Sequence, residues 1–198
     1  MNETFAEYTN YLLSMDQSGK KYLKERDIKI QTANEMKIGM FHETEKMKNY
    51  MIAKGFKEEE LVKYDLINLN GNSKWKDRLL FPIKDASGNI HGFGGRRINE
   101  GADAKYLNTA ESEIFKKDRL FFNLDQAMPE IRKEKRILLT EGYIDVIQAS
   151  QHQLKNVVAC LGTSLTKNHI SYLSKLHTQV VLIYDGDNPG INAAIKNS

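Results

Sequence analysis

The first sixty residues carry apolar side chains at helical spacing. Phe5, Tyr8, Leu12 and Met15 recur at intervals of three or four positions, which places them on one face of a helix. Residues 3–63 are also rich in Lys, Glu and Met. The pattern therefore predicts several helices, packed as a small helical subdomain.

Around residue 68 the pattern changes to that of a sheet. A β-hairpin is predicted from two apolar strands and a polar turn: RLLFPI (78–83), DASGN (85–89) and IHGFGGRRI (90–98). Gly88 suits the positive φ of a bulged turn. Glycine weakens pairing inside a strand, so its repetition in the second strand suggests that the backbone lies close to a ligand. The glycines concerned are Gly92, Gly94 and Gly95.

The last third alternates between short apolar strands and helical segments. In order these are strand ILLTE (137–141), helix YIDVIQAS (143–150), strand NVVACL (156–161), helix TKNHISYLSKL (166–176) and strand VVLIYD (180–185). Such alternation predicts a parallel sheet with helices on both faces. In these sheets ligands bind at the carboxyl ends of the strands, at the point where the winding switches direction.

Acids stand at the ends of the first and third of these strands. Glu141 precedes a glycine, and Asp185 and Asp187 flank another. An unpaired charge at the end of a buried strand is costly, so each acid needs a partner. Carboxylates without Cys or His favour Mg²⁺ or Mn²⁺ over zinc. One such motif alone is more often an ordinary loop, but two at equivalent strand ends predict a metal site.

Asp145 follows Glu141 by four residues and falls near the same edge if the helix begins at once. Two roles are open for it. It is either a further acidic site residue that acts through the metal ligands or a first-turn acid that favours the helix dipole.

Charge is concentrated in one part of the chain. Residues 74–119 hold ten Lys or Arg against seven Asp or Glu, and the remaining residues balance, so this segment accounts for the net charge of +3. A local basic excess is what a phosphate-binding surface needs, although a charge run is also typical of an ordinary solvated face.

The cysteine content and the lack of membrane-targeting segments exclude several classes of protein. The single cysteine, Cys160, cannot form an internal disulfide and lies in the apolar run VVACL, which predicts a buried side chain. One thiol and five histidines give no structural zinc spacing. No apolar run reaches the roughly 18 residues of a membrane span, and MNETFAEYTN lacks the blocks of a signal peptide. We expect a cytoplasmic protein that needs neither zinc nor a membrane.

Three motifs of the last third resemble the Toprim fold, which DnaG-type primases share with topoisomerases and some nucleases: EGYIDV (141–146), LGTSLT (161–166) and YDGDNPG (184–190). Upstream segments resemble, in order and spacing, the RNA polymerase core of bacterial primases. They are KDRLLFPI (76–83), GNIHGFGGR (88–96), KYLNT (105–109) and IFKKDRLFF (114–122). The resemblance implies a mixed α+β subdomain over residues 1–130, followed by a Toprim-like, Rossmann-type α/β sheet over residues 131–198.

The resemblance also implies an activity and its residues. We expect metal-dependent, template-directed synthesis of short RNA primers on single-stranded DNA from ribonucleoside triphosphates. Glu141, Asp185 and Asp187 are the implied Mg²⁺ or Mn²⁺ ligands, with Asp145 as a further acidic site residue. The implied nucleotide- and template-binding residues are Arg78, Arg96, Lys105, Tyr106, Asn108 and Lys117. Tyr106 and Trp75 are also candidates for stacking on bases, although single aromatic residues are more often part of a core.

Some of the family's features have no counterpart in this sequence. These are the zinc-binding N-terminal domain, the later acids of the Toprim fold and the region that recruits the replicative helicase. Asn188 and Pro189 stand where the family often carries a basic residue followed by Ala-Gly-Arg. Two other functions are therefore kept: a module that binds single-stranded DNA or nucleotides without polymerising, and a Toprim nuclease.

Overall fold

The computed structural model describes residues 1–100, 104–162, 165–184 and 186 of the chain. It divides into two compact units. The first comprises Met1–Pro82 and Ile90–Phe115, and the second Ile83–Asn89 and Lys116–Ser198. The predicted domain division after residue 130 stays a prediction.

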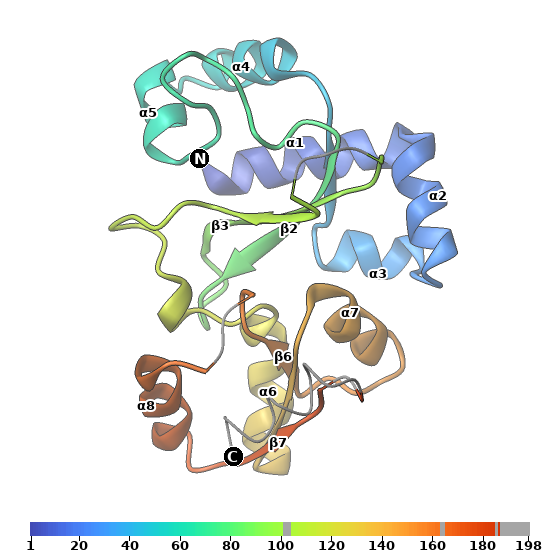
Figure 1. Cartoon of the computed structure of the whole chain (residues 1–198), viewed down its shortest axis with the longest axis vertical. Helices are drawn as coiled ribbons and strands as arrows, with labels where there is room; N and C mark the ends of the chain where they lie inside the picture. The colour runs from blue at the N-terminus through green and yellow to red at the C-terminus, as the bar shows by residue number, and fades with distance from the viewer. Residues whose placement is uncertain (101–103, 163–164, 185, 187–198) are drawn as a thin grey trace. The chain divides into compact units, whose positions relative to one another are not determined.

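The first unit combines helices with an antiparallel sheet (Figure 1). Its helices are α1 (Asn2–Met15), α2 (Gln17–Glu25), α3 (Ile30–Glu35), α4 (Thr44–Ala53) and α5 (Glu58–Lys63). Its sheet has the order β1 (Gly39–Phe41), β2 (Arg78–Lys84), β3 (Ile90–Arg97) and β4 (Tyr106–Asn108). The predicted N-terminal helices are confirmed, and the three-residue strands β1 and β4 were not predicted.

The predicted hairpin is formed by β2 and β3, which are neighbours in the sheet. In its turn the Asp85 N–H donates to the Asn89 carbonyl at 3.0 Å. Gly88 has a φ of 89°, a left-handed conformation that glycine adopts at little cost. The prediction of a turn glycine is therefore confirmed.

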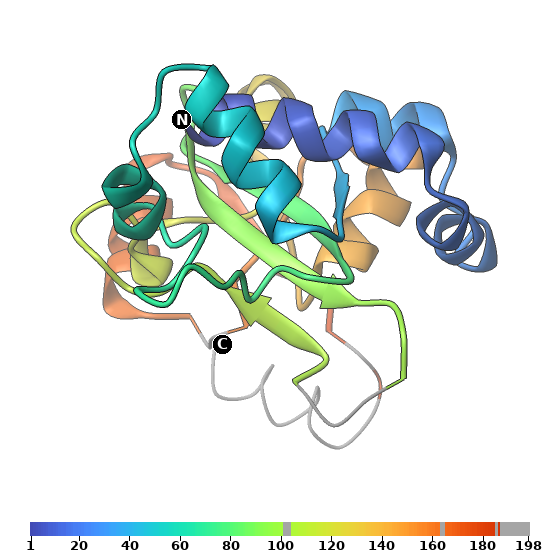
Figure 2. The same cartoon turned by 90° about the horizontal axis from the view of Figure 1, so that it is seen from above.

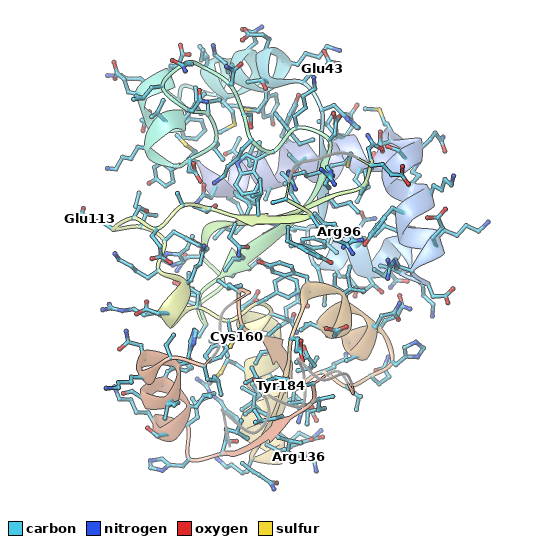
Figure 3. The ribbon with its side chains drawn as sticks, in the orientation of Figure 1. Glu43, Arg96, Glu113, Arg136, Cys160 and Tyr184 are labelled. Atoms are coloured by element: carbon cyan, nitrogen blue, oxygen red, sulfur yellow. The ribbon has the colours of Figure 1, made fainter. Side chains whose placement is uncertain are left out.

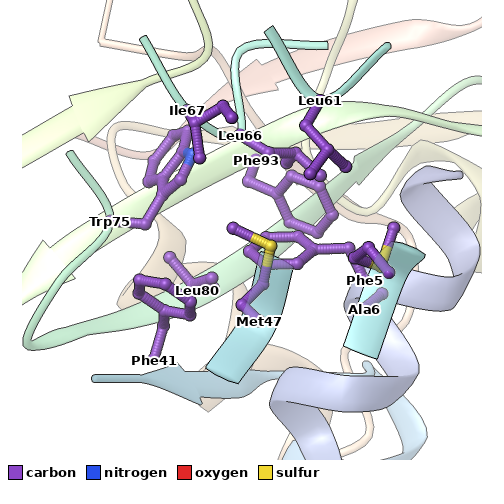
Figure 4. Packing of buried hydrophobic residues seen from close by; sticks show 11 residues of the cluster. Phe5, Ala6, Phe41, Met47, Leu61, Leu66, Ile67, Trp75, Leu80 and Phe93 are labelled. Carbon is purple, nitrogen blue, oxygen red and sulfur yellow. The ribbon is translucent and has the colours of Figure 1, made fainter. Parts of the chain in front are cut away.

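Aromatic and aliphatic side chains from helices and strands form the core of the first unit (Figure 4). The Phe5 ring on α1 lies 5.0 Å from that of Phe93 on β3, edge to face, an arrangement that aromatic pairs favour. Figure 2 shows α1 lying over the sheet. The buried face of α1 consists of Asn2, Phe5, Ala6, Thr9 and Leu13. Of the four apolar residues whose spacing predicted the helix, Phe5 belongs to this face, whereas Met15 is 55% exposed. The helix is therefore confirmed, but its buried face is offset from the one that the spacing predicted.

A histidine joins the start of α2 to the segment that precedes β2. The two ring nitrogens of His42 lie 2.9 Å from Asp77 Oδ1 and 2.7 Å from Asp16 Oδ2. Asp16 also caps α2, because its carboxylate accepts a hydrogen bond from the Gly19 N–H. Burial acts to lower the pKa of His42, but hydrogen bonds to Asp77 and Asp16 outweigh it and raise the pKa above 6.5.

We expect this link to make stability depend on pH. Because the folded-state pKa of His42 is raised, its contribution is complete below the unfolded pKa of 6.5 and is lost as pH rises through the folded pKa. The His42→Gln variant should therefore melt below the wild type at about pH 6, with a smaller difference at about pH 9. Thermal unfolding followed by circular dichroism measures both values. A difference that grows toward high pH would contradict the assignment.

The second unit contains the predicted parallel sheet. Its elements are the 3₁₀ helix η1 (Lys117–Arg119), α6 (Leu124–Glu134), β5 (Arg136–Thr140), α7 (Tyr143–Gln151), β6 (Val157–Ala159), α8 (Lys167–Lys175) and β7 (Gln179–Leu182). The strand order is β6-β5-β7, and both pairs are parallel. The predicted fold class, a mixed subdomain with an α/β parallel sheet, is confirmed. The helix α6 was not predicted, and Pro129 inside it interrupts the helical signal.

Helices cover this sheet through alternate strand residues. Ile137 and Leu139 of β5 and Val158 of β6 share a core with α6 and α8. Successive strand residues point to opposite faces, so Val157 points the other way, and α7 packs on this strand as well. Cys160 is buried in the same core as Val158, and burial raises its thiol pKa to about 12. The prediction of a buried cysteine is therefore confirmed.

No helix in the described part of the chain combines the length and the apolar character needed to cross a bilayer.

Candidate active site

The carboxyl ends of β5 and β7 lie side by side. Leu139 of β5 is in register with Leu182 of β7, and the Ile183 N–H donates to the Leu139 carbonyl at 2.8 Å. The chain passes from β5 to β6 on one side and then to β7 on the other, so the winding switches between β5 and β7. The ends of these two strands are therefore where a parallel α/β sheet binds its ligand.

Acids follow both of these strand ends. Glu141 comes directly after β5 and is exposed. Tyr184, labelled in Figure 3, comes two residues after β7. The predicted ligands Asp185 and Asp187 lie outside the described residues. Among the described residues no group of three His, Cys, Asp or Glu side chains is arranged to hold a metal ion, so the convergence of the three acids stays a prediction.

Asp145 serves as a helix cap. The α7 helix begins at Tyr143, so Asp145 lies in its first turn, and its Oδ2 accepts a hydrogen bond from the Gly142 N–H at 3.0 Å. A carboxylate at this position is favourable because the N-terminus of a helix carries a partial positive charge. The cap fixes the backbone that directly follows Glu141.

A basic and aromatic cluster lies on the sheet of the first unit. Arg96 on β3 is in register with Tyr106 on β4, and its Cζ lies 4.9 Å from the centre of the Tyr106 ring. Arg96 is only 8% exposed, whereas Tyr106 is 41% exposed. The structure thus brings together two residues that the sequence predicted as template-binding.

Arg78 and Lys105 support the same region. Arg78 is 3% exposed, and its Nη1 donates to the carbonyls of Ala104 at 2.9 Å and of Lys105 at 3.4 Å. The Lys105 side chain is exposed. These contacts of Arg78 hold the segment that leads into β4, so Arg78 fixes the backbone that carries Lys105.

Asn108 is the last residue of β4 and is held at its backbone. Its carbonyl accepts a hydrogen bond from Lys74 Nζ at 2.9 Å, and Lys74 also pairs with Asp65. Lys74 belongs to the basic segment 74–119 but was not among the predicted site residues.

The glycines of β3 are explained by packing. A Cβ on Gly92 would lie 2.7 Å from the Phe115 ring and from Thr109 Oγ1, and a Cβ on Gly95 would lie 2.9 Å from the Trp75 ring. The prediction that these two glycines admit a ligand is therefore wrong, because side chains of the same chain occupy the space. Trp75 is fully buried, which makes it a core residue and not a platform for bases.

Lys117 lies in the second unit, within η1. Its carbonyl accepts a hydrogen bond from His169 Nε2 at 2.9 Å, and Thr166 Oγ1 donates to the Asp118 carbonyl at 3.1 Å. His169 is fully buried, and its desolvation lowers its pKa, which favours the neutral ring. The start of α8 therefore holds the short helix that carries Lys117.

Tyr22 is a residue of the basic cluster that the sequence did not predict. Tyr22 on α2 lies with its ring centre 5.1 Å from Arg96 Cζ. Nothing in the local pattern around Tyr22 points to a site, because its neighbour Arg96 is distant in sequence and only the packing of α2 brings the two together.

Comparison with known families agrees with this architecture. Residues 8–128 match the N-terminal domain of the DNA primase catalytic core, and residues 138–198 match a Toprim-like family. The parallel unit, with its switch point between β5 and β7, thus defines a Toprim-containing protein. The chain belongs to the family of bacterial DnaG-type primases, as part of their catalytic core.

Individual relatives are similar along nearly the whole chain. A DNA primase of Lactococcus lactis subsp. lactis is 37% identical, over 99% of this chain and 32% of the relative. The crystal structure of the zinc-binding and RNA polymerase domains of Aquifex aeolicus primase matches with a TM-score of 0.93 and 32% identity, over 98% of this chain and 49% of that one. A DnaG primase catalytic domain bound to single-stranded DNA matches with a TM-score of 0.83 and 29% identity, over 98% of this chain and 62% of that one. The chain spans about a third of the length of the curated relatives it matches.

Proposed function

We propose that this chain provides the metal-binding and template-binding parts of a DNA primase, which joins ribonucleotides into short RNA primers on single-stranded DNA. The main support is the register of β5 and β7, which brings the strand ends next to Glu141 and Asp185 to one edge of the sheet. Membership of the primase family supports the reaction, and the single-stranded DNA bound by a similar catalytic domain supports the template.

Glu141, Asp185 and Asp187 would hold Mg²⁺ or Mn²⁺. The donor set fits a hard cation, because it consists of carboxylates that follow adjacent parallel strands. When bound, the metal activates the attacking 3′-hydroxyl and stabilises the leaving pyrophosphate. Asp145 acts through its cap, since it holds the start of α7 and with it the backbone after Glu141. Zinc has no role in this proposal.

The basic cluster would bind the template and the incoming nucleotide. Arg96 and Tyr106 lie on the neighbouring strands β3 and β4, and Lys105 directly precedes β4. Together they offer a guanidinium, an exposed ammonium group and an exposed ring. Such groups bind phosphates and stack on bases without reading sequence. Asn108 continues the same strand, and Arg78 holds the backbone of Lys105. Lys117, which belongs to the second unit, is proposed separately as a nucleotide- or template-binding cation.

Nucleotides, the growing primer and single-stranded DNA are thus the proposed partners. Template-directed incorporation of labelled ribonucleotides with Mn²⁺ tests the proposal directly. Product that requires both template and metal supports it. DNA binding without product indicates a binding module, and metal-dependent cleavage of the DNA indicates a nuclease.

Replacing Arg96 by alanine should weaken single-stranded DNA binding by about tenfold, because a charge-assisted hydrogen bond to phosphate contributes about 1.5 kcal/mol or more. Removing one phosphate contact should also reduce the slope of log K against log salt concentration by about 0.7. Fluorescence anisotropy of labelled oligonucleotides at several salt concentrations measures both effects. Arg132→Ala is the matched control, because Arg132 is an exposed arginine on α6. Equal salt slopes in the Arg96 variant and the wild type would refute the template contact.

A further inference from the structure

Among the described residues, the buried cation Arg96 contacts two aromatic rings and no carboxylate. Its Cζ lies 5.1 Å from the centre of the Tyr22 ring and 4.9 Å from that of Tyr106. Within the described residues no Asp or Glu forms an ion pair with it, and its buried Nε has no hydrogen-bond partner. Figure 3 shows Arg96 near the end of β3.

Contact with aromatic rings affects the ability of Arg96 to bind an anion differently from contact with a carboxylate. A buried charge is costly unless a partner compensates it. A carboxylate would do so, but it would also neutralise the cation and occupy its N–H groups. The face of an aromatic ring attracts a guanidinium while it accepts few of its hydrogen bonds. Arg96 is therefore stabilised in the fold and still able to bind an anion.

Of the two rings that contact Arg96, that of Tyr22 is the buried one. It is 9% exposed and belongs to α2, whereas Tyr106 belongs to β4, the strand next to that of Arg96, and is 41% exposed. The Tyr22 hydroxyl is buried and has no hydrogen-bond partner among the described residues. The ring, and not the hydroxyl, is therefore what Tyr22 offers to Arg96.

Charges around Tyr22 agree with this role. Burial raises the pKa of the Tyr22 phenol, with the nearby Arg96 and Arg26 cations acting in the opposite direction. The phenol therefore stays neutral at physiological pH and does not become an anion that would pair with Arg96. Arg26 Cζ lies 5.7 Å from the same ring, so Tyr22 has a second arginine as a neighbour.

We propose that Tyr22 is a positioning residue of the template-binding site: its ring holds the Arg96 guanidinium in place, unpaired, for a phosphate of single-stranded DNA. The inference rests on the proposed function, because it assigns to Arg96 a contact with the template. Tyr22 itself does not touch the DNA. Its effect is transmitted only through Arg96.

Ringless and ring-retaining variants separate this role from a purely structural one. Tyr22→Leu should lower the affinity for a single-stranded oligonucleotide by about tenfold and reduce the salt slope by about 0.7, as Arg96→Ala does. Tyr22→Phe keeps the ring and should bind like the wild type. In the Tyr22→Leu, Arg96→Ala double variant the losses of affinity should not add, because each change removes the same contact between Arg96 and the phosphate.

A control variant at Tyr50, in the same unit, separates a loss of stability from a loss of DNA binding. Tyr50 on α4 stacks on Tyr8, and Lys54 Nζ lies 5.5 Å from its ring, so Tyr50→Leu also removes a ring beside a cation. It should lower the melting temperature without changing the salt slope. Tyr22→Met, whose flexible side chain fills irregular gaps, provides a second ringless variant if Tyr22→Leu does not fold.

The outcomes distinguish the inference from the proposed function. A reduced salt slope in Arg96→Ala together with a wild-type slope in Tyr22→Leu and Tyr22→Met overturns the role of Tyr22 alone. A wild-type slope in Arg96→Ala overturns the template contact itself. Additive losses in the double variant also overturn the inference, because Tyr22 would then act independently of Arg96.

Discussion

Replacing Glu141 by glutamine or Asp185 by asparagine is expected to lower primer synthesis by about 100-fold or more. The amide has nearly the shape of the carboxylate but lacks its charge, and a bound cation contributes several kcal/mol of stabilisation to the transition state. Incorporation of labelled ribonucleotides on a single-stranded template, titrated with Mn²⁺, measures the loss. Both variants should also need more Mn²⁺ for half-maximal rate.

Glu130→Gln is the matched control for Glu141→Gln. Glu130 lies on α6 in the same unit and pairs with Lys133 one turn away. Salt bridges at the protein surface contribute little to stability. Its activity should equal that of the wild type. Wild-type rates in Asp185→Asn would remove the metal site from the mechanism.

The second large effect concerns stability. Trp75→Ala should destabilise the protein by about 3–5 kcal/mol, because it empties a fully buried site and leaves the Asp65 carbonyl without the indole N–H that donates to it at 2.9 Å. The midpoint of urea unfolding measures the change. The salt slope of DNA binding by the folded fraction should stay unaltered.

Tyr106→Ala should behave in the opposite way. Tyr106 is 41% exposed, so its loss should lower the urea midpoint much less than the loss of Trp75. DNA binding should weaken, since stacking contributes about 1–3 kcal/mol per base. A Trp75 variant with wild-type stability and weakened DNA binding would restore the interpretation of Trp75 as a base platform.

The sequence predicted the helices, the strands and the candidate acids. It did not predict which elements and side chains lie next to one another in the fold. Alternating strands and helices predicted the parallel sheet, and the position of Glu141 followed from the end of the first strand. The order β6-β5-β7 depends on tertiary packing, and no local pattern encodes it. That order is what makes the ends of β5 and β7 adjacent.

Glycine and tyrosine illustrate the same limit. Gly95 signalled a close approach correctly, but the sequence does not show that the approaching group is the Trp75 ring. Tyr22 gave no signal at all, because its importance depends on contact with a distant arginine. The template-binding residues were predicted from the family resemblance. Composition alone does not distinguish a basic template-binding surface from an ordinary solvated face.

The metal site is tested most directly by diffraction from crystals soaked in Mn²⁺. An anomalous difference map should show a peak within coordination distance of the Glu141, Asp185 and Asp187 carboxylates, at the edge of the sheet where β5 and β7 end. Glu141 directed away from both aspartates, with no anomalous peak near them, would contradict the account.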